Sequence, residues 1–153
     1  MRIADVMSKD VAESSPSEHA AIAWDKMRAH RIHHLVVIEG SRVVGVLSER
    51  DLHGIDPKVR LEKTVGELMA REPVTVSPET TLREAANLMR GNRIGCLPVM
   101  DGAQLAGIVT TTDLLEQLGR GLPEHGHGAH SRAGRGAKKQ ALATTGRSPR
   151  GWR

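Results

Sequence analysis

The sequence repeats itself with an offset of 62 residues. Aligned with itself at this offset, the chain matches without a gap from Asp5/Glu67 to Leu52/Leu114, and 14 of these 48 pairs are identical. The identical pairs include Met7/Met69, Pro16/Pro78, Arg31/Arg93, Gly45/Gly107 and Asp51/Asp113. An internal repeat of this length indicates that one supersecondary unit is built twice, and it constrains the fold more than any other feature.

Each copy predicts the same order of elements. A short helix (3–7; 65–69) and a short extended segment (11–14; 74–76) precede a longer helix, which we expect the prolines Pro16 and Pro78 to open. Alanines, Trp24 and Met27 form an apolar stripe along the first of these helices, and Leu82, Ala85, Ala86 and Met89 form its counterpart. Two apolar strands follow (35–38 and 43–47; 97–100 and 105–109), joined by turns that contain Gly40 and Gly102. A final helix begins near Glu49 and near Thr111, so the predicted fold class is α/β (α+β) with the order βαββα in each copy.

A single copy is too small to be stable alone. A unit of roughly 55 residues buries too little apolar surface, and two such units solve this by packing their sheets together about a pseudo-two-fold axis. This arrangement leaves two equivalent clefts. We therefore expect repeat 1 in residues 1–60 and repeat 2 in residues 61–118.

The charge separates the repeats from the rest of the chain. Residues 1–118 contain 14 Lys/Arg and 17 Asp/Glu (net −3), whereas residues 119–153 contain 8 Lys/Arg and one acid (net +7). The latter segment has eight glycines and few large apolar residues, so we expect 119–153 to be a disordered basic tail. The tail could contact nucleic acid, but it lacks interleaved aromatic residues and a nucleic-acid-binding fold, which argues against that partner.

Composition also limits the compartment and the chemistry. The apolar runs are too short for a membrane span, no signal peptide is recognisable, and the single cysteine, Cys96, suits a reducing cytoplasm. Cys96 lies in an apolar run that is typical of a core residue rather than a nucleophile. His30, His33 and His34 extend across a predicted helix end and strand start, so we expect no metal site there. We also expect no catalytic residues.

Each copy contains the same pair of motifs. The first copy has Met27-x-x-x-Arg31-Ile32-His33-His34-Leu35-Val36-Val37 followed by Gly45-Val46-Leu47-Ser48-Glu49-Arg50-Asp51-Leu52. The second copy has Met89-x-x-x-Arg93-Ile94-Gly95-Cys96-Leu97-Pro98-Val99 followed by Gly107-Ile108-Val109-Thr110-Thr111-Thr112-Asp113-Leu114. On these motifs the two copies resemble repeats of the cystathionine-β-synthase-type (CBS) domain family, and the resemblance covers about residues 2–118. It implies a non-catalytic regulatory module that binds an adenine nucleotide (AMP, ADP, ATP or S-adenosylmethionine) as a regulatory ligand and uses no other cofactor. It also implies a homodimer formed through the CBS pairs and a protein target that the sequence does not name.

The resemblance further implies which residues hold the nucleotide. In the family motif Gly-h-h-Ser/Thr-x-x-Asp (h, hydrophobic), the carboxylate accepts the ribose hydroxyls, and the hydroxyl and helix amides suit a phosphate. The first site is implied to contain Val46, Ser48, Asp51, Thr64, Met69, Ile94, Gly95 and Cys96, with His33 and His34 toward the phosphates. The second site is implied to contain Ile108, Thr110 and Asp113, with Ile3 and Ile32 opposite. Because Arg50 has Thr112 as its counterpart, the first site suits an anionic ligand better than the second.

Two alternatives stay open. The pairs Ser48/Asp51 and Thr110/Asp113 also fit helix capping boxes, which stabilise a helix start by about 0.5–2 kcal/mol without any ligand. At the level of the whole protein, the alternative is a structural or interaction protein with empty clefts, whose basic tail contacts a polyanionic partner.

Overall fold

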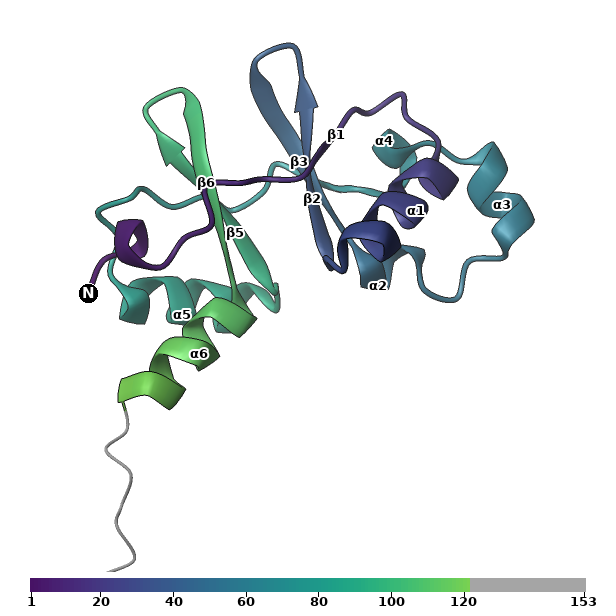
Figure 1. Ribbon diagram of the computed structural model, residues 1–153. Helices are drawn as coiled ribbons and strands as arrows, with labels where there is room; N and C mark the ends of the chain where they lie inside the picture. Colours follow the sequence, from purple (N-terminus) through teal and green to yellow (C-terminus); the bar gives the residue numbers. More distant parts are fainter. Residues whose placement is uncertain (122–153) are drawn as a thin grey trace, which may run out of the picture. The chain divides into compact units, whose positions relative to one another are not determined.

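The computed structural model describes residues 1–121, and most of the predicted tail lies outside these described residues. The first half of the chain forms η1 (Ile3–Asp5), β1 (Glu13–Ser14), α1 (Ala20–His30), β2 (His34–Glu39), β3 (Arg42–Ser48), α2 (Glu49–Leu52) and α3 (Pro57–Glu62). The second half forms α4 (Val65–Leu68), β4 (Ala70–Arg71), α5 (Leu82–Asn92), β5 (Cys96–Asp101), β6 (Gln104–Thr110) and α6 (Thr111–Gly121). The predicted mixed α and β fold of two repeats is confirmed (Figure 1).

The two hairpins are equivalent in detail. β2 pairs antiparallel with β3, and β5 pairs antiparallel with β6, each through a two-residue turn that begins with a glycine. Gly40 and Gly102 have φ of 62° and 61°, a left-handed conformation that other residues seldom adopt. Each hairpin also has a register shift at the same place, after Val37 and after Val99. The predicted strands and turns are therefore confirmed in both copies.

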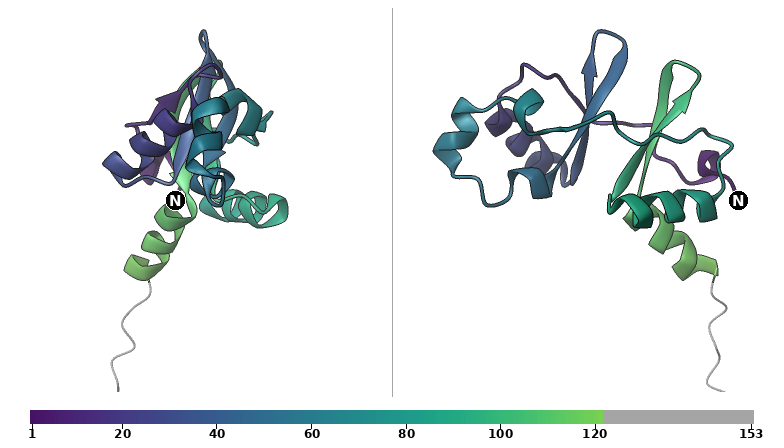
Figure 2. Two further views of the ribbon diagram at one scale, coloured as in Figure 1. Left: turned by 90° about the vertical axis from the view of Figure 1, so that its right-hand side faces the viewer. Right: turned by 180° about the vertical axis from the view of Figure 1, so that it is seen from behind.

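The segment that precedes each repeat packs on the other repeat. The backbone N–H of Ile3 donates to Thr80 O (2.8 Å), and the equivalent N–H of Val65 donates to Glu18 O (2.8 Å). β4 then pairs with β3 of the first repeat, and Ser8 forms the corresponding bridge to Ile108 in β6 of the second. The N-terminal segment accordingly lies beside β5, β6 and α5 in both views (Figures 1 and 2). This reciprocal exchange joins the two repeats into one unit.

Two glycines make room for the exchanged segments. A Cβ on Gly45 would lie 2.5 Å from Met69 Sδ and 2.8 Å from Ala70 O. A Cβ on Gly107 would lie 2.6 Å from Ser8 O and 2.9 Å from Met7 Sδ. Only glycine fits at both positions, since the contacts include backbone oxygens that cannot swing away.

Three clusters of buried side chains form the core. One lies under α1 and contains Met27, Leu35, Leu47 and the exchanged Val65. Its equivalent lies under α5 and contains Met89, Leu97, Val109 and the exchanged Ile3. The third cluster joins the faces of the two hairpins, with Val36, Cys96 and Ile108 at its centre and Val46 beside them. Both faces of each hairpin are therefore covered, as the packing of two small repeats requires.

The predicted starts of both long helices and one residue of the predicted apolar stripe were wrong. The long helices begin at Ala20 and Leu82, after the prolines, because Pro16 O and Pro78 O accept hydrogen bonds from the exchanged N–H groups of Gly66 and Ala4. On α5 the stripe runs through Leu88, whereas Ala86 is exposed.

The final helix of repeat 1 is interrupted. α2 ends at Leu52, Gly54 has φ of 84°, and a further helix, α3, follows. Sequence analysis missed α3, although Asp56 before Pro57 is a typical helix start, and the Asp56 carboxylate does accept the N–H of Lys58 (2.7 Å).

The counterpart of that helix, α6, is continuous and ends at Gly121, so its last three residues, 119–121, belong to the predicted tail. An ion pair between Arg120 and Glu116 (3.1 Å) spans its last turn, a spacing that supports a helix. None of the helices described within residues 1–121 is long and apolar enough to cross a bilayer.

Candidate functional site

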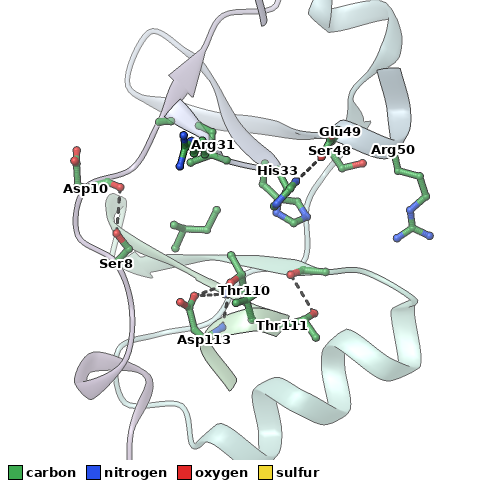
Figure 3. Close-up of a pocket in the computed structure, with 16 residues that line it drawn as sticks. Ser8, Asp10, Arg31, His33, Ser48, Glu49, Arg50, Thr110, Thr111 and Asp113 are labelled. Carbon is green, nitrogen blue, oxygen red and sulfur yellow. Dashed lines mark hydrogen bonds and ion pairs between the residues drawn. The ribbon is translucent and has the colours of Figure 1, made fainter. Parts of the chain in front are cut away.

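Two cavities lie between the repeats, one beside each Ser/Thr-x-x-Asp motif. The Asp51 cavity has a volume of about 400 Å³ and is lined by His34, Val46, Ser48, Arg50, Asp51, Ala70, Arg71, Glu72, Pro73, Val74, Asn92, Arg93, Ile94, Gly95 and Cys96. The Asp113 cavity has a volume of about 600 Å³ and is lined by Ser8, Asp10, Ala12, Arg31, Ile32, His33, His34, Ser48, Glu49, Arg50, Gly95, Ile108, Thr110, Thr111, Thr112 and Asp113 (Figure 3). Both are within the size range of small-molecule sites.

The aspartate of each motif lies in the first turn of a helix and accepts a hydrogen bond from the residue that precedes this helix. Asp51 Oδ2 accepts the N–H of Ser48 (2.8 Å), and Ser48 Oγ accepts the N–H of Asp51 (3.3 Å). Asp113 Oδ2 accepts both the N–H (2.7 Å) and the hydroxyl (2.8 Å) of Thr110. The capping alternative is thus realised in both copies. It uses one oxygen of each carboxylate, and Oδ1 makes no hydrogen bond within residues 1–121, so capping does not exclude a ligand.

The walls of the two cavities differ in charge. Three arginines (Arg50, Arg71, Arg93) and two acids (Asp51, Glu72) line the Asp51 cavity, a formal balance of +1. Two arginines (Arg31, Arg50) and three acids (Asp10, Glu49, Asp113) line the Asp113 cavity, a formal balance of −1. The Asp51 cavity is therefore the better environment for an anion.

An arginine in an unusual backbone conformation lines each cavity. Arg31 and Arg93 end α1 and α5 with φ of 53° and 55°, in the left-handed region where glycine usually terminates a helix. A side chain there costs about 1 kcal/mol relative to glycine. Both copies have this conformation, so each cavity is lined by the arginine that ends the neighbouring long helix.

The two histidines have different surroundings. His33 lines only the Asp113 cavity, and its Nδ1 pairs with the Glu49 carboxylate. His34 lines both cavities, and burial lowers its pKa below the usual 6.5, with a smaller lowering by His33. Of the two histidines that the sequence placed in the first site, His34 therefore lines the Asp51 cavity and His33 does not.

Three other predicted site residues line neither cavity. Ile3 is fully buried in the core under α5. Thr64 directly precedes α4 and donates its N–H to Glu67 Oε2 (2.8 Å), and Met69 packs over Gly45. All three residues belong to the exchanged segments that join the repeats. The remaining predicted residues line the two cavities in the groups predicted from the sequence. The Asp51 cavity contains Val46, Ser48, Asp51, Ile94, Gly95 and Cys96, and the Asp113 cavity contains Ile32, Ile108, Thr110 and Asp113.

Sequence analysis missed one wall of each cavity. Residues 70–74 line the Asp51 cavity, and Ser8, Asp10 and Ala12 line the Asp113 cavity. These two segments are equivalent by the 62-residue offset, and each follows an exchanged helix. The repeat itself was the available signal, since a segment present twice beside a motif has the same place in both copies.

Cys96 belongs to the apolar wall of the Asp51 cavity. It is buried, and burial together with the charge of Asp51 raises the pKa of its thiol to about 12. The side chain remains a neutral thiol at physiological pH, so it can contact an apolar ligand group but is not an activated nucleophile.

Comparison with known proteins identifies the repeats. The family model described as CBS domain matches residues 3–55 and 65–120. The chain belongs to the CBS domain family. A CBS domain-containing protein of Dictyostelium discoideum is 32% identical over 131 residues, covering 76% of this chain and 90% of the relative.

Longer proteins and solved structures contain regions similar to this CBS pair. An inosine-5'-monophosphate dehydrogenase of Korarchaeum cryptofilum is 36% identical over 107 residues, but the match spans 69% of this chain and only 22% of the dehydrogenase. The crystal structure of CBSX2 in complex with AMP has a TM-score of 0.69 and 26% identity, covering 78% of this chain and 97% of that chain.

Proposed function

We propose that this CBS pair is a non-catalytic regulatory module that binds an adenine nucleotide in the Asp51 cavity. The observation that carries the proposal is the composition of that cavity: three arginines at a wall that also holds an aspartate carboxylate and an apolar surface. Arginines suit phosphates, a carboxylate suits two ribose hydroxyls, and Val46, Ile94 and Cys96 suit an adenine ring. The similar structure of CBSX2 in complex with AMP supports this class of ligand.

The order of preference follows from the charges. A wall with a formal balance of +1 favours AMP, ADP and ATP over the positively charged S-adenosylmethionine in the Asp51 cavity. The Asp113 cavity, with its balance of −1, favours a ligand of less negative charge. The proposal includes a homodimer, for which Ile22 on α1 and Leu115 and Leu118 on α6 provide exposed apolar side chains.

Melting experiments with two matched variants test the proposal. The melting temperature is followed during titration with AMP, ADP, ATP, S-adenosylmethionine and NAD, because a ligand at 100 times its dissociation constant adds about 2.7 kcal/mol of stability. Asp51→Asn keeps an oxygen that can cap Ser48 but loses the carboxylate charge. We expect at least a tenfold loss of AMP or ATP affinity, about 1.4 kcal/mol, with little change in the stability of the free protein.

Asp113→Asn is the control, because it makes the same change in the other cavity and should weaken the tightest binding much less. If no ligand shifts the melting temperature, or if both variants bind nucleotides like the wild type, the aspartates act only as helix caps and the proposal is wrong.

A further inference from the structure

Four residues line both cavities: His34, Ser48, Arg50 and Gly95. They form a shared wall where the start of β2, the end of β3 and the start of β5 meet. Within this wall Arg50 is the one side chain with a permanent charge. Any charged ligand in either cavity therefore interacts with the same guanidinium group.

Arg50 is not committed to a partner in the described part of the chain. It is exposed and makes neither an ion pair nor a side-chain hydrogen bond with residues 1–121, whereas the neighbouring Glu49 pairs with His33. Figure 3 shows its side chain at the end of the Asp113 cavity opposite Ser8 and Asp10. A long, unpaired arginine at a common wall can turn its guanidinium toward the ligand that attracts it more strongly.

The second repeat has no equivalent of Arg50. The counterpart by the 62-residue offset is Thr112, which lines the Asp113 cavity alone. If a ligand in the Asp51 cavity pairs with Arg50, the wall of the Asp113 cavity has one remaining arginine, Arg31, and three acids, Asp10, Glu49 and Asp113. Its formal balance then falls from −1 to −2. Neighbouring His34 does not replace the lost charge near neutral pH, because burial lowers its pKa.

We propose that Arg50 couples the two cavities, so that a phosphate-bearing ligand in the Asp51 cavity weakens the binding of a second such ligand in the Asp113 cavity. This inference rests on the proposed nucleotide binding and adds its regulation. A guanidinium turned toward a phosphate in the Asp51 cavity offers less charge and fewer hydrogen bonds to a phosphate in the Asp113 cavity, and the two phosphate groups repel each other across the shared wall. The favoured doubly occupied state has a nucleotide in the Asp51 cavity and a neutral or cationic adenosyl ligand in the Asp113 cavity.

Calorimetric titration of the full chain with ATP and with adenosine tests the coupling. In the wild type the first ATP binds in the Asp51 cavity and pairs with Arg50. The second ATP therefore binds in an Asp113 cavity where Arg50 is no longer available. In Asp51→Asn the Asp51 cavity is weakened, and the Asp113 cavity has Arg50 available. We expect ATP to bind the Asp113 cavity of this variant about tenfold more tightly than the second ATP binds the wild type.

The gain should depend on Arg50 and on phosphate. The double variant Asp51→Asn/Arg50→Thr should lose it, while Asp51→Asn/Arg42→Thr, which removes an arginine that lines neither cavity, should keep it. Adenosine has no phosphate, so its affinity for the Asp113 cavity should be equal in the wild type and in Asp51→Asn. In the strongest form of the expected result, the wild type binds only one ATP. The Asp51→Asn variant then also binds one ATP, but in the Asp113 cavity.

Other outcomes would overturn the inference in distinguishable ways. If two ATP molecules bind and the Asp113 cavity has the same affinity for ATP in the wild type and in Asp51→Asn, the cavities are independent and nucleotide binding alone survives. The coupling also fails if Arg42→Thr abolishes the gain as fully as Arg50→Thr. If neither ATP nor adenosine binds, the proposed function fails together with the coupling.

Discussion

The Asp51 cavity and the Asp113 cavity occupy equivalent places in a duplicated backbone, yet their walls carry opposite formal charge. The turns, the capping carboxylates, the left-handed arginines and the glycines under the exchanged segments occur at the same place in both copies. The differences lie in side chains on the cavity walls, such as Arg50 against Thr112 and His34 against Cys96. The comparison shows that the duplicated backbone places the two cavities, while a few side chains on their walls make the cavities different in charge.

The largest effect should test the equivalence of the two backbones. Gly45→Ala and Gly107→Ala each push a methyl group into a backbone oxygen of an exchanged segment, at 2.8 Å and 2.6 Å, so each should cost about 1–3 kcal/mol of unfolding free energy. Gly91→Ala is the control, because it lies within α5 with nothing within 4 Å of the new Cβ and should stabilise by about 0.5–1 kcal/mol. Denaturant unfolding measures all three. Two glycine positions that differ strongly would show that only one exchanged segment is tightly packed.

A smaller effect should test the difference in charge between the walls of the two cavities. Arg93→Gly and Arg31→Gly both relieve a left-handed arginine, so each should raise the unfolding free energy by about 1 kcal/mol. Their effects on the first ATP should differ: Arg93→Gly removes a cation from the Asp51 cavity and should weaken it about tenfold, whereas Arg31→Gly should leave it nearly unchanged. Equal losses of affinity in the two variants would contradict the assignment of the nucleotide to the Asp51 cavity.

The smallest effect should come from His34, whose counterpart Cys96 does not titrate near neutral pH. Burial lowers the pKa of His34 in the folded chain, so between that pKa and 6.5 the unfolded state binds more protons than the folded state. The stability of the free protein should therefore fall as pH drops below 6.5 and should be insensitive to His34 above it. Between pH 7.5 and 5.5, the drop in melting temperature should be about 1–2 °C smaller in His34→Gln than in the wild type. The control is His30→Gln, at a residue that lines neither cavity, and its drop should equal that of the wild type. An identical pH profile in wild type and His34→Gln would show that His34 is not buried in solution as it is here.

Much of the fold could be predicted because its signals are local. The strands β2, β3, β5 and β6 lie within one or two residues of the apolar runs that predicted them, and both hairpin turns contain the expected glycine. The capping pairs Ser48/Asp51 and Thr110/Asp113 also depend on residues three apart, so their hydrogen bonds follow from spacing. The helix starts were misplaced because the carbonyl groups of Pro16 and Pro78 accept hydrogen bonds from exchanged segments that are distant in the sequence.

By itself, the sequence determined that two βαββα units must share a core, and which motif lies beside each cavity. Only the tertiary structure decided which repeat each leading segment packs on, because a segment such as Ile3 or Val65 is apolar in the same way toward either sheet. That choice buries Ile3, and it places residues 70–74 in the wall of one cavity and Ser8 and Asp10 in the wall of the other. The physical reason is that burial of apolar surface has no direction, so periodicity predicts that a face is covered, whereas the connections and the close backbone contacts at Gly45 and Gly107 select what covers it.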